Sequence, residues 1–363
     1  MSNTLFSPLE AGSFELPNRI VMAPLTRCRA DEGRVPSDEA RVYYTQRATA
    51  GLILTEATSV TPMGVGYPNT PGIWSQEQVE GWRKITDSVH EEGGRIVLQL
   101  WHVGRISHSS YLDGNLPVAP SAIAAQGHVS LLRPITDYEV PRALELDEIP
   151  GIVEAYRQGA ENAKAAGFDG VEVHGANGYL LDQFLQDSSN HRTDEYGGSI
   201  ENRARLALEV TDAVISVWGA DHVGYHIAPR GDSHSVGDSD LRATFGYLVS
   251  ELSKRGIAFI FSRASREDAT LTTELRDLFD GVWIANQQVS PEEAEDLLES
   301  GAADAISWGQ QFIANPDLVE RLRIGAPLNA PNPATFYLAP GADDDKNVGY
   351  TDYPFLETAN ATR

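Results

Sequence analysis

Gly170-Val-Glu-Val-His-Gly-Ala-Asn-Gly-Tyr179 is the most informative segment of this sequence, because it combines a strand pattern with a glycine-rich turn. Its first five residues alternate as in a β-strand, so the two valines lie on one face and Glu172 and His174 lie on the other. The preceding residues 149–166 have apolar side chains at helical spacing, which predicts an amphipathic helix. A helix that leads into a largely apolar strand is typical of a parallel sheet covered by helices.

Short apolar runs rich in β-branched residues recur along the chain, and they predict eight strands. These strands are residues 19–23, 51–55, 95–100, 170–174, 223–227, 257–261, 281–285 and 304–308. Eight strand–helix units favour an α/β fold of the closed (β/α)8 type, a TIM barrel, over an open doubly wound sheet. The number of strands does not by itself prove closure.

No fixed-period repeat, low-complexity block or linker divides the 363 residues. We therefore expect one domain over residues 1–363, with the barrel at about 17–325 and a tail at 326–363. A long connection, residues 102–146, leaves the C-terminal end of the third strand, on the face where such barrels carry active sites. It is either a lid or a structural excursion that caps the barrel.

The chain is strongly acidic, with 28 Lys and Arg against 52 Asp and Glu and a formal net charge of -24. Nucleic acid and anionic membranes are therefore poor candidate partners. No stretch reaches the roughly 18 to 20 apolar residues needed to span a bilayer, and the N-terminus does not resemble a secretory signal. The only cysteine, Cys28, excludes an internal disulfide and a cysteine-rich zinc site, so we expect a cytoplasmic protein.

The turn after the strand at 170–174 carries the first candidate catalytic residues. His174 ends that strand facing the barrel axis, and two glycines then let the chain turn so that Asn177 and Tyr179 lie beside it. Two of these groups can donate hydrogen bonds to a substrate oxygen, and the third can deliver a proton. On the residues alone, the alternative is a strand-end histidine, a turn asparagine and a core tyrosine without a catalytic role.

Other polar residues end the first and third strands. Gln99 lies between strand leucines, where a buried amide is costly without a partner, so it either binds a ligand or is a satisfied core amide. Thr26 follows the first strand and places a hydroxyl on the same barrel face. The chain lacks the dinucleotide-binding glycine motif, the P-loop, the nucleophile elbow of α/β-hydrolases and the zinc-hydrolase motif, so those classes lose support.

Several motifs together resemble the old yellow enzyme family, which are FMN-dependent reductases of activated alkenes on a (β/α)8 barrel. The motifs are residues 16–27 (LPNRIVMAPLTR), 54–58 (LTEAT), 99–105 (QLWHVGR), 174–179 (HGANGY), 190–199 (NHRTDEYGGS), 312–318 (FIANPDL) and 349–354 (GYTDYP). They occur in family order, each at the expected barrel strand. This match favours the catalytic interpretation of His174, Asn177 and Tyr179.

The resemblance implies that FMN lies across the barrel mouth and that NADH or NADPH reduces it. Thr26 would donate near flavin N5, and Gln99 would bond the pyrimidine edge. Further implied cofactor-binding residues are Pro24, Leu25, Ala57, His226, Asn286, Gln287, Gly309 and Gln310. His174 and Asn177 would bond the oxygen of an α,β-unsaturated carbonyl or nitroalkene, and Tyr179 would protonate the α-carbon. The implied lining of the substrate pocket is Tyr67, Trp101 and Tyr350, with the tail returning to the active site.

The match departs from the family at the cofactor. Family members commonly have an arginine at the end of the fifth strand and another in the eighth-strand loop, where this chain has His226 and Gln310. The FMN phosphate would then depend on backbone N–H groups and amides, which predicts weaker FMN affinity unless Arg230 or Arg263 compensates.

Three rival interpretations remain. The first is a nitrate-ester or nitroaromatic reductase on the same scaffold. The second, a barrel aldolase or isomerase, is disfavoured because no lysine ends a strand. The third is a flavin-poor, non-catalytic ligand-binding barrel.

Overall fold

Eight parallel strands close into a barrel in the computed structural model, which describes residues 4–230, 233–264, 269–286, 288–338 and 345–356. The barrel strands are β3 (Ile20–Met22), β4 (Leu52–Leu54), β6 (Ile96–Trp101), β9 (Gly170–His174), β10 (Val223–Ile227), β11 (Phe259–Arg263), β12 (Val282–Asn286) and β13 (Ala305–Trp308). Each pairs with the next in this order, and β13 pairs back with β3. The predicted strands and the closed barrel are therefore confirmed.

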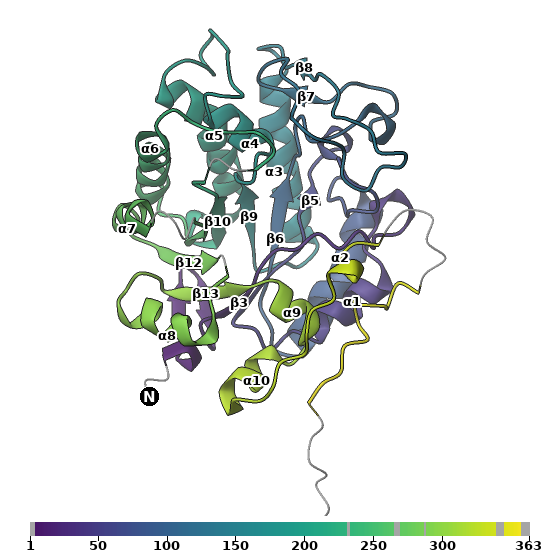
Figure 1. Cartoon of the computed structure of the whole chain (residues 1–363), viewed down its shortest axis with the longest axis vertical. Helices are drawn as coiled ribbons and strands as arrows, with labels where there is room; N and C mark the ends of the chain where they lie inside the picture. Colours follow the sequence, from purple (N-terminus) through teal and green to yellow (C-terminus); the bar gives the residue numbers. More distant parts are fainter. Residues whose placement is uncertain (1–3, 231–232, 265–268, 287, 339–344, 357–363) are drawn as a thin grey trace, which may run out of the picture.

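Helices surround this barrel, as Figure 1 shows. They are α1 (Asp38–Thr45), α2 (Gln76–Glu91), α3 (Ile149–Ala165), α4 (Leu180–Leu185), α5 (Ile200–Trp218), α6 (Leu241–Lys254), α7 (Ala269–Asp277), α8 (Pro291–Glu299), α9 (Gln310–Ala314) and α10 (Leu318–Ile324). Short 3₁₀ helices occur at Thr4–Phe6, Glu32–Arg34, Pro62–Gly64, Ser109–Tyr111, Ala220–His222 and Pro333–Thr335. The helix predicted at 149–166 is α3.

Apolar side chains form two layers of core. One layer lies inside the barrel and includes Val21, Leu52, Val97, Phe259 and Ile284. The other lies between the strands and the helices and includes both valines of β9. Each aliphatic side chain buried in this way contributes about 1.5 to 3 kcal/mol.

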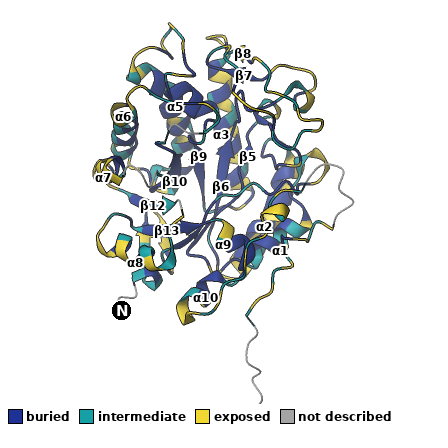
Figure 2. Cartoon of the chain, viewed as in Figure 1, coloured by how far each residue is buried: buried dark blue, intermediate teal, exposed yellow. Residues whose placement is uncertain are grey.

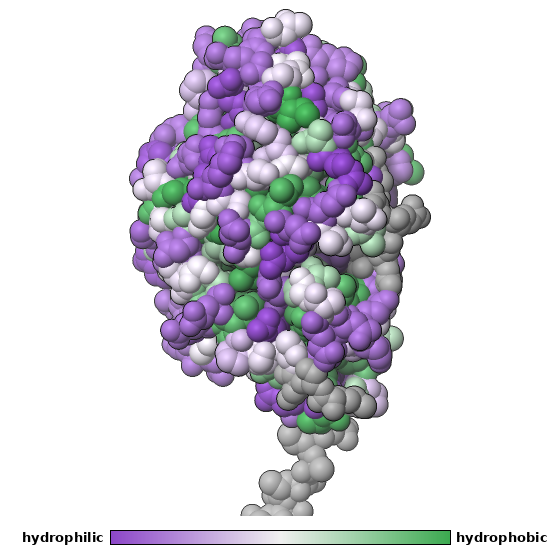
Figure 3. All heavy atoms as spheres, turned by 90° about the vertical axis from the view of Figure 1, so that its left-hand side faces the viewer, coloured by the Kyte–Doolittle hydropathy of each residue, from purple (hydrophilic) through white to green (hydrophobic). Residues whose placement is uncertain are grey.

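The inner faces of the helices are therefore buried, whereas their outer faces are exposed (Figure 2). The side of the molecule that carries α6, α7 and α8 is mainly hydrophilic, with small scattered apolar groups (Figure 3). Within the described ranges, none of the helices combines the length and the apolar character that crossing a membrane requires.

The remaining strands lie at the two ends of the barrel. β1 (Leu9–Ala11) and β2 (Phe14–Leu16) form an antiparallel hairpin whose apolar side chains join the layer inside the barrel. β5 (Thr58–Ser59) extends the sheet beside the end of β6. The long connection between β6 and α3 contains the short paired strands β7 (Val118–Ala119) and β8 (Arg142–Ala143). It packs on Trp101 and so forms a wall beside the C-terminal ends of the strands.

The C-terminal segment returns to the barrel and lies against α1 (Figure 1). Arg27, just after β3, donates to the carbonyl oxygens of Phe336 and Gly349 at 2.9 and 2.7 Å. Arg29 donates to the carbonyl oxygens of Thr335 and Val348 at 3.0 and 2.9 Å. Two buried guanidinium groups from the beginning of the barrel thus bind the last described segment.

Candidate active site

A cavity of about 700 Å³ opens at the C-terminal ends of the barrel strands. This volume is in the range of small-molecule and cofactor sites. The predicted site residues on its wall are Pro24, Leu25, Thr26, Ala57, Gln99, Trp101, His174, Asn177, Tyr179, His226, Asn286, Gly309 and Gln310. Inward-pointing side chains supply much of the wall because successive residues of a strand alternate between the barrel interior and the helix layer.

His174 is held as a neutral hydrogen-bond donor. Its Nδ1 accepts the Ala176 N–H at 3.3 Å, so the ring proton is on Nε2. Burial lowers the pKa of His174 to about 3, so the ring remains neutral through the physiological pH range. The ring also lies 4.8 Å from that of His226, centroid to centroid. His174 therefore offers a donor that does not titrate near pH 7.

Asn177 and Gly178 make the sharp turn that the two glycines predicted. Both have positive φ angles, +58° and +77°. The Gly178 N–H donates to the Asp182 carboxylate at 2.8 Å, and the Asn177 carbonyl is bonded by the His234 ring at 2.7 Å. At the side chain, Arg263 Nη1 donates to Asn177 Oδ1 at 2.9 Å. The asparagine is thus fixed at both its backbone and its amide.

Tyr179 stands at the start of α4 among other rings. Its hydroxyl is 2.9 Å from that of Tyr67, and its ring meets Trp101 and His174 edge-to-face at 5.0 and 5.1 Å. Burial raises the pKa of Tyr179, so its hydroxyl keeps its proton at neutral pH. Tyr67 is not among the described residues that line the cavity, and it contacts the site through Tyr179 and Trp101.

Three buried polar groups lie side by side inside the barrel, beneath His174. Gln99 Nε2 donates to Glu172 Oε2 at 2.6 Å and lies 3.2 Å from His226 Nδ1. Burial raises the pKa of Glu172 to about 8 and lowers the pKa of His226, so both are neutral near pH 7. In the described part of the chain, His226 Nε2 and Glu172 Oε1 have no hydrogen-bond partner. Such buried polar atoms indicate a site for a polar ligand.

One predicted site residue is placed differently, and another is not described. Tyr350 is fully buried away from the cavity lining, stacked on Tyr43 at 4.2 Å, with the Arg27 and Arg29 guanidinium groups 4.9 and 4.7 Å from its ring. It is part of the returning tail and points toward α1, where the Tyr43 ring and the two guanidinium groups surround it. Tyr337 of the same tail lines the cavity instead. Gln287 lies outside the described residues.

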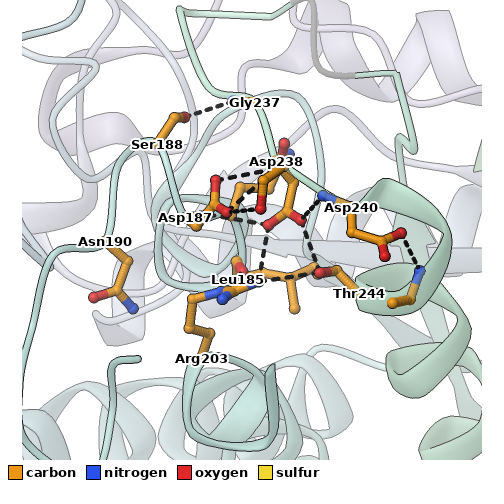
Figure 4. Close-up of polar contacts among 12 residues, drawn as sticks. Leu185, Asp187, Ser188, Asn190, Arg203, Gly237, Asp238, Asp240 and Thr244 are labelled. Carbon is orange, nitrogen blue, oxygen red and sulfur yellow. Dashed lines mark hydrogen bonds and ion pairs between the residues drawn. The ribbon is translucent and has the colours of Figure 1, made fainter. Parts of the chain in front are cut away.

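An ion-pair network holds the loop between β10 and α6, which carries His234. Figure 4 shows Arg203 of α5 beneath this loop, paired with the buried carboxylate of Asp238 at 3.0 Å. Asp238 also accepts from the Thr244 hydroxyl at 2.9 Å and the Asp187 N–H at 3.1 Å. The loop is therefore bonded to α5, to α6 and to the segment that follows α4.

Sequence reasoning missed several residues of the wall. The strand predicted at 257–261 ends two residues before β11 does, so the sequence suggests Arg263 only as a source of charge for the phosphate. Phe259, Phe261 and Arg263 share one face of that strand, so a longer predicted strand would have placed Arg263 at its inner end. His234 contacts Asn177 and Tyr179 but does not line the cavity. No sequence signal indicates it, because it lies in an irregular loop.

Comparison with known proteins agrees with this geometry. Residues 4–329 match the model of the NADH:flavin oxidoreductase / NADH oxidase family. The chain belongs to this family. Membership of the NADH:flavin oxidoreductase family confirms the resemblance to old yellow enzyme, the oxidoreductase class and FMN as the cofactor.

Named members of the NADH:flavin oxidoreductase family cover almost the whole chain. 12-Oxophytodienoate reductase 1 of Oryza sativa subsp. japonica is 44% identical over 366 residues, covering 97% of this chain and 93% of the relative. A protein named "probable flavin mononucleotide-dependent alkene reductase" from Leishmania infantum is 46% identical over 367 residues, covering 98% of each. The solved structure of morphinone reductase in complex with tetrahydroNAD has a TM-score of 0.92 and 47% identity, covering 98% of this chain and 99% of that chain.

Proposed function

We propose that this chain reduces the C=C bond of α,β-unsaturated carbonyl compounds or nitroalkenes, with NADH or NADPH as the reductant. One observation carries the proposal: His174, Asn177 and Tyr179 line a single cavity at the catalytic face of the barrel. The family relatives named for reduction of 12-oxophytodienoate, morphinone and alkenes support the same substrate class.

The cavity residues fit FMN. Gln99 offers a polar contact for the ring edge, and so does His226 Nε2, which has no partner among the described residues; Thr26 provides a hydroxyl. Asn286, Gly309 and Gln310 lie on the wall supplied by the last two strands and would meet the phosphate. FMN bound here and reduced by the nicotinamide coenzyme would supply the hydride for the substrate β-carbon.

The protein side chains would bind and polarise the substrate. The Nε2–H of His174 and the amide of Asn177 would donate to the carbonyl or nitro oxygen, on which negative charge develops as the β-carbon accepts hydride. Donors that strengthen as this charge grows accelerate the step. The Tyr179 hydroxyl would transfer its proton to the α-carbon, which completes addition of two hydrogens, and water would return a proton to the phenolate.

An anaerobic titration tests this proposal. The purified protein should show flavin absorbance that bleaches when NADPH or NADH is added and returns when 2-cyclohexenone follows. Cyclohexanone, which lacks the C=C bond, is the control and should not restore the absorbance. Colourless protein that FMN cannot reconstitute would defeat the cofactor assignment. Reoxidation by nitrate esters or nitroaromatics, but by no enone, would favour the rival substrate class.

We also propose that residues 1–363 act as one cytoplasmic domain, with the barrel at about 17–325 and a tail at 326–363. The bonds from Arg27 and Arg29 to the tail support a single unit. The single cysteine, Cys28, supports a reducing compartment.

A further inference from the structure

Arg263 is a cationic side chain in direct contact with one member of the proposed oxygen-binding pair, Asn177. It ends β11, its side chain is on the cavity wall, and its Nη1 lies 2.9 Å from Asn177 Oδ1. The proposed hydride and proton transfers do not involve it directly. Its contact with Asn177 joins residues 86 positions apart in the sequence, so the fold itself creates it.

The contact with Arg263 determines which end of the Asn177 side-chain amide faces the cavity. A guanidinium has only donors, so the amide must turn its oxygen toward Arg263. The –NH₂ is then the remaining polar end of the amide, and it can donate to a substrate oxygen. Without Arg263, the amide could turn its oxygen into the cavity, where it would repel a developing negative charge.

The backbone alone does not fix this orientation. Asn177 has a φ of +58°, and His234 bonds its carbonyl oxygen, but neither constraint distinguishes the two ends of the side-chain amide. Arg263 does so, and its positive charge also polarises the amide, because a donor bonded through its own acceptor to a cation becomes stronger.

We propose that Arg263 is a positioning residue that holds the Asn177 amide with its –NH₂ toward the substrate oxygen. This inference rests on the proposed function, because it deepens the role given there to Asn177. The permanent charge of arginine keeps the orientation independent of pH.

Steady-state kinetics of FMN-loaded variants test the inference. Arg263→Met should lower kcat/KM for 2-cyclohexenone about ten- to hundredfold, the effect of losing one charge-assisted hydrogen bond. Arg263→Lys, which keeps a cationic donor, should recover part of this loss. In an Asn177→Ala background, Arg263→Met should have little further effect. Arg255→Met is the control. Arg255 follows the end of α6 and pairs with Asp212 of α5, so the kcat/KM of this variant should match that of wild type.

A binding measurement separates this inference from the proposed function. The anion of 4-nitrophenol resembles the charged substrate oxygen, so the protein should lower the pKa of the bound phenol. Arg263→Met should reduce that lowering by about one pH unit, with Arg263→Lys in between. Equal phenol pKa values in wild type and Arg263→Met, or losses in kcat/KM that multiply in the double variant, would overturn the inference. If the wild type reduces no enone, the phenol titration still tests whether Arg263 orients the Asn177 amide.

Discussion

Replacing Glu172 with glutamine should remove a pH-dependent loss of stability. Glu172 is fully buried inside the barrel, where Gln99 donates to it and the neighbouring His226 is neutral. Glutamine has nearly the shape of the protonated carboxyl group and can accept the same bond from Gln99. The variant therefore mimics the neutral form of Glu172 and cannot ionise.

The size of the effect follows from the pKa of the buried carboxyl group. Burial raises the pKa of Glu172 from 4.5 to about 8, so the folded protein keeps a proton that the unfolded chain releases above pH 4.5. The contribution of Glu172 to the free energy of unfolding is therefore greatest below pH 4.5. It decreases as the pH rises to about 8 and is constant above that value. At 1.36 kcal/mol per pH unit, the loss reaches at most about 5 kcal/mol, of which about 3 to 4 kcal/mol falls between pH 5 and pH 8.

Urea unfolding of the FMN-free protein at several pH values measures this difference. The free energy of unfolding of Glu172→Gln minus that of wild type should increase by about 3 to 4 kcal/mol between pH 5 and pH 8. The exposed Glu299→Gln is the matched control and should follow wild type. Parallel stability curves for wild type and Glu172→Gln would show that Glu172 ionises normally in the folded state, and the argument from burial would then be wrong.

Three further predictions concern the site. Tyr179→Phe should lower enone turnover by about 10² to 10⁴-fold, as measured by consumption of enone, while the coenzyme still bleaches the flavin; unchanged turnover would exclude Tyr179 as the proton donor. The KM for the enone should be nearly constant from about pH 6 to pH 8, because His174 stays neutral with a pKa of about 3; a steep rise would contradict this. Tyr350→Ala should cost about 3 to 5 kcal/mol of stability but leave the KM near that of wild type, because Tyr350 packs on Tyr43 and not on the cavity; thermal melting and kinetics would check both.

The sequence predicted the regular parts of this molecule well, and its errors lie where regularity ends. Strand alternation placed His174 on the inner face of β9, because a period of two leaves only two choices. Tyr350 lies in an irregular segment, where no periodicity gives the direction of a side chain, and the prediction for it failed. The sequence does not indicate Arg263 as a partner of Asn177, because the ends of strands are the least certain part of a periodic pattern. The bond between Gln99 and Glu172 joins neighbouring strands, and their register was not predicted.

The bonds from Arg27 and Arg29 to the tail also determine when the site can be completed during synthesis. Arg27 is 322 residues from its partner Gly349, so the loop after β3 lacks this partner until residue 349 has left the ribosome. Thr26, on the cavity wall, adjoins that loop. A nascent chain therefore cannot complete the cavity wall, which includes Tyr337, before the tail has been made. In a chain truncated before the tail, both guanidinium groups would lose their carbonyl acceptors there and would have to bind water instead.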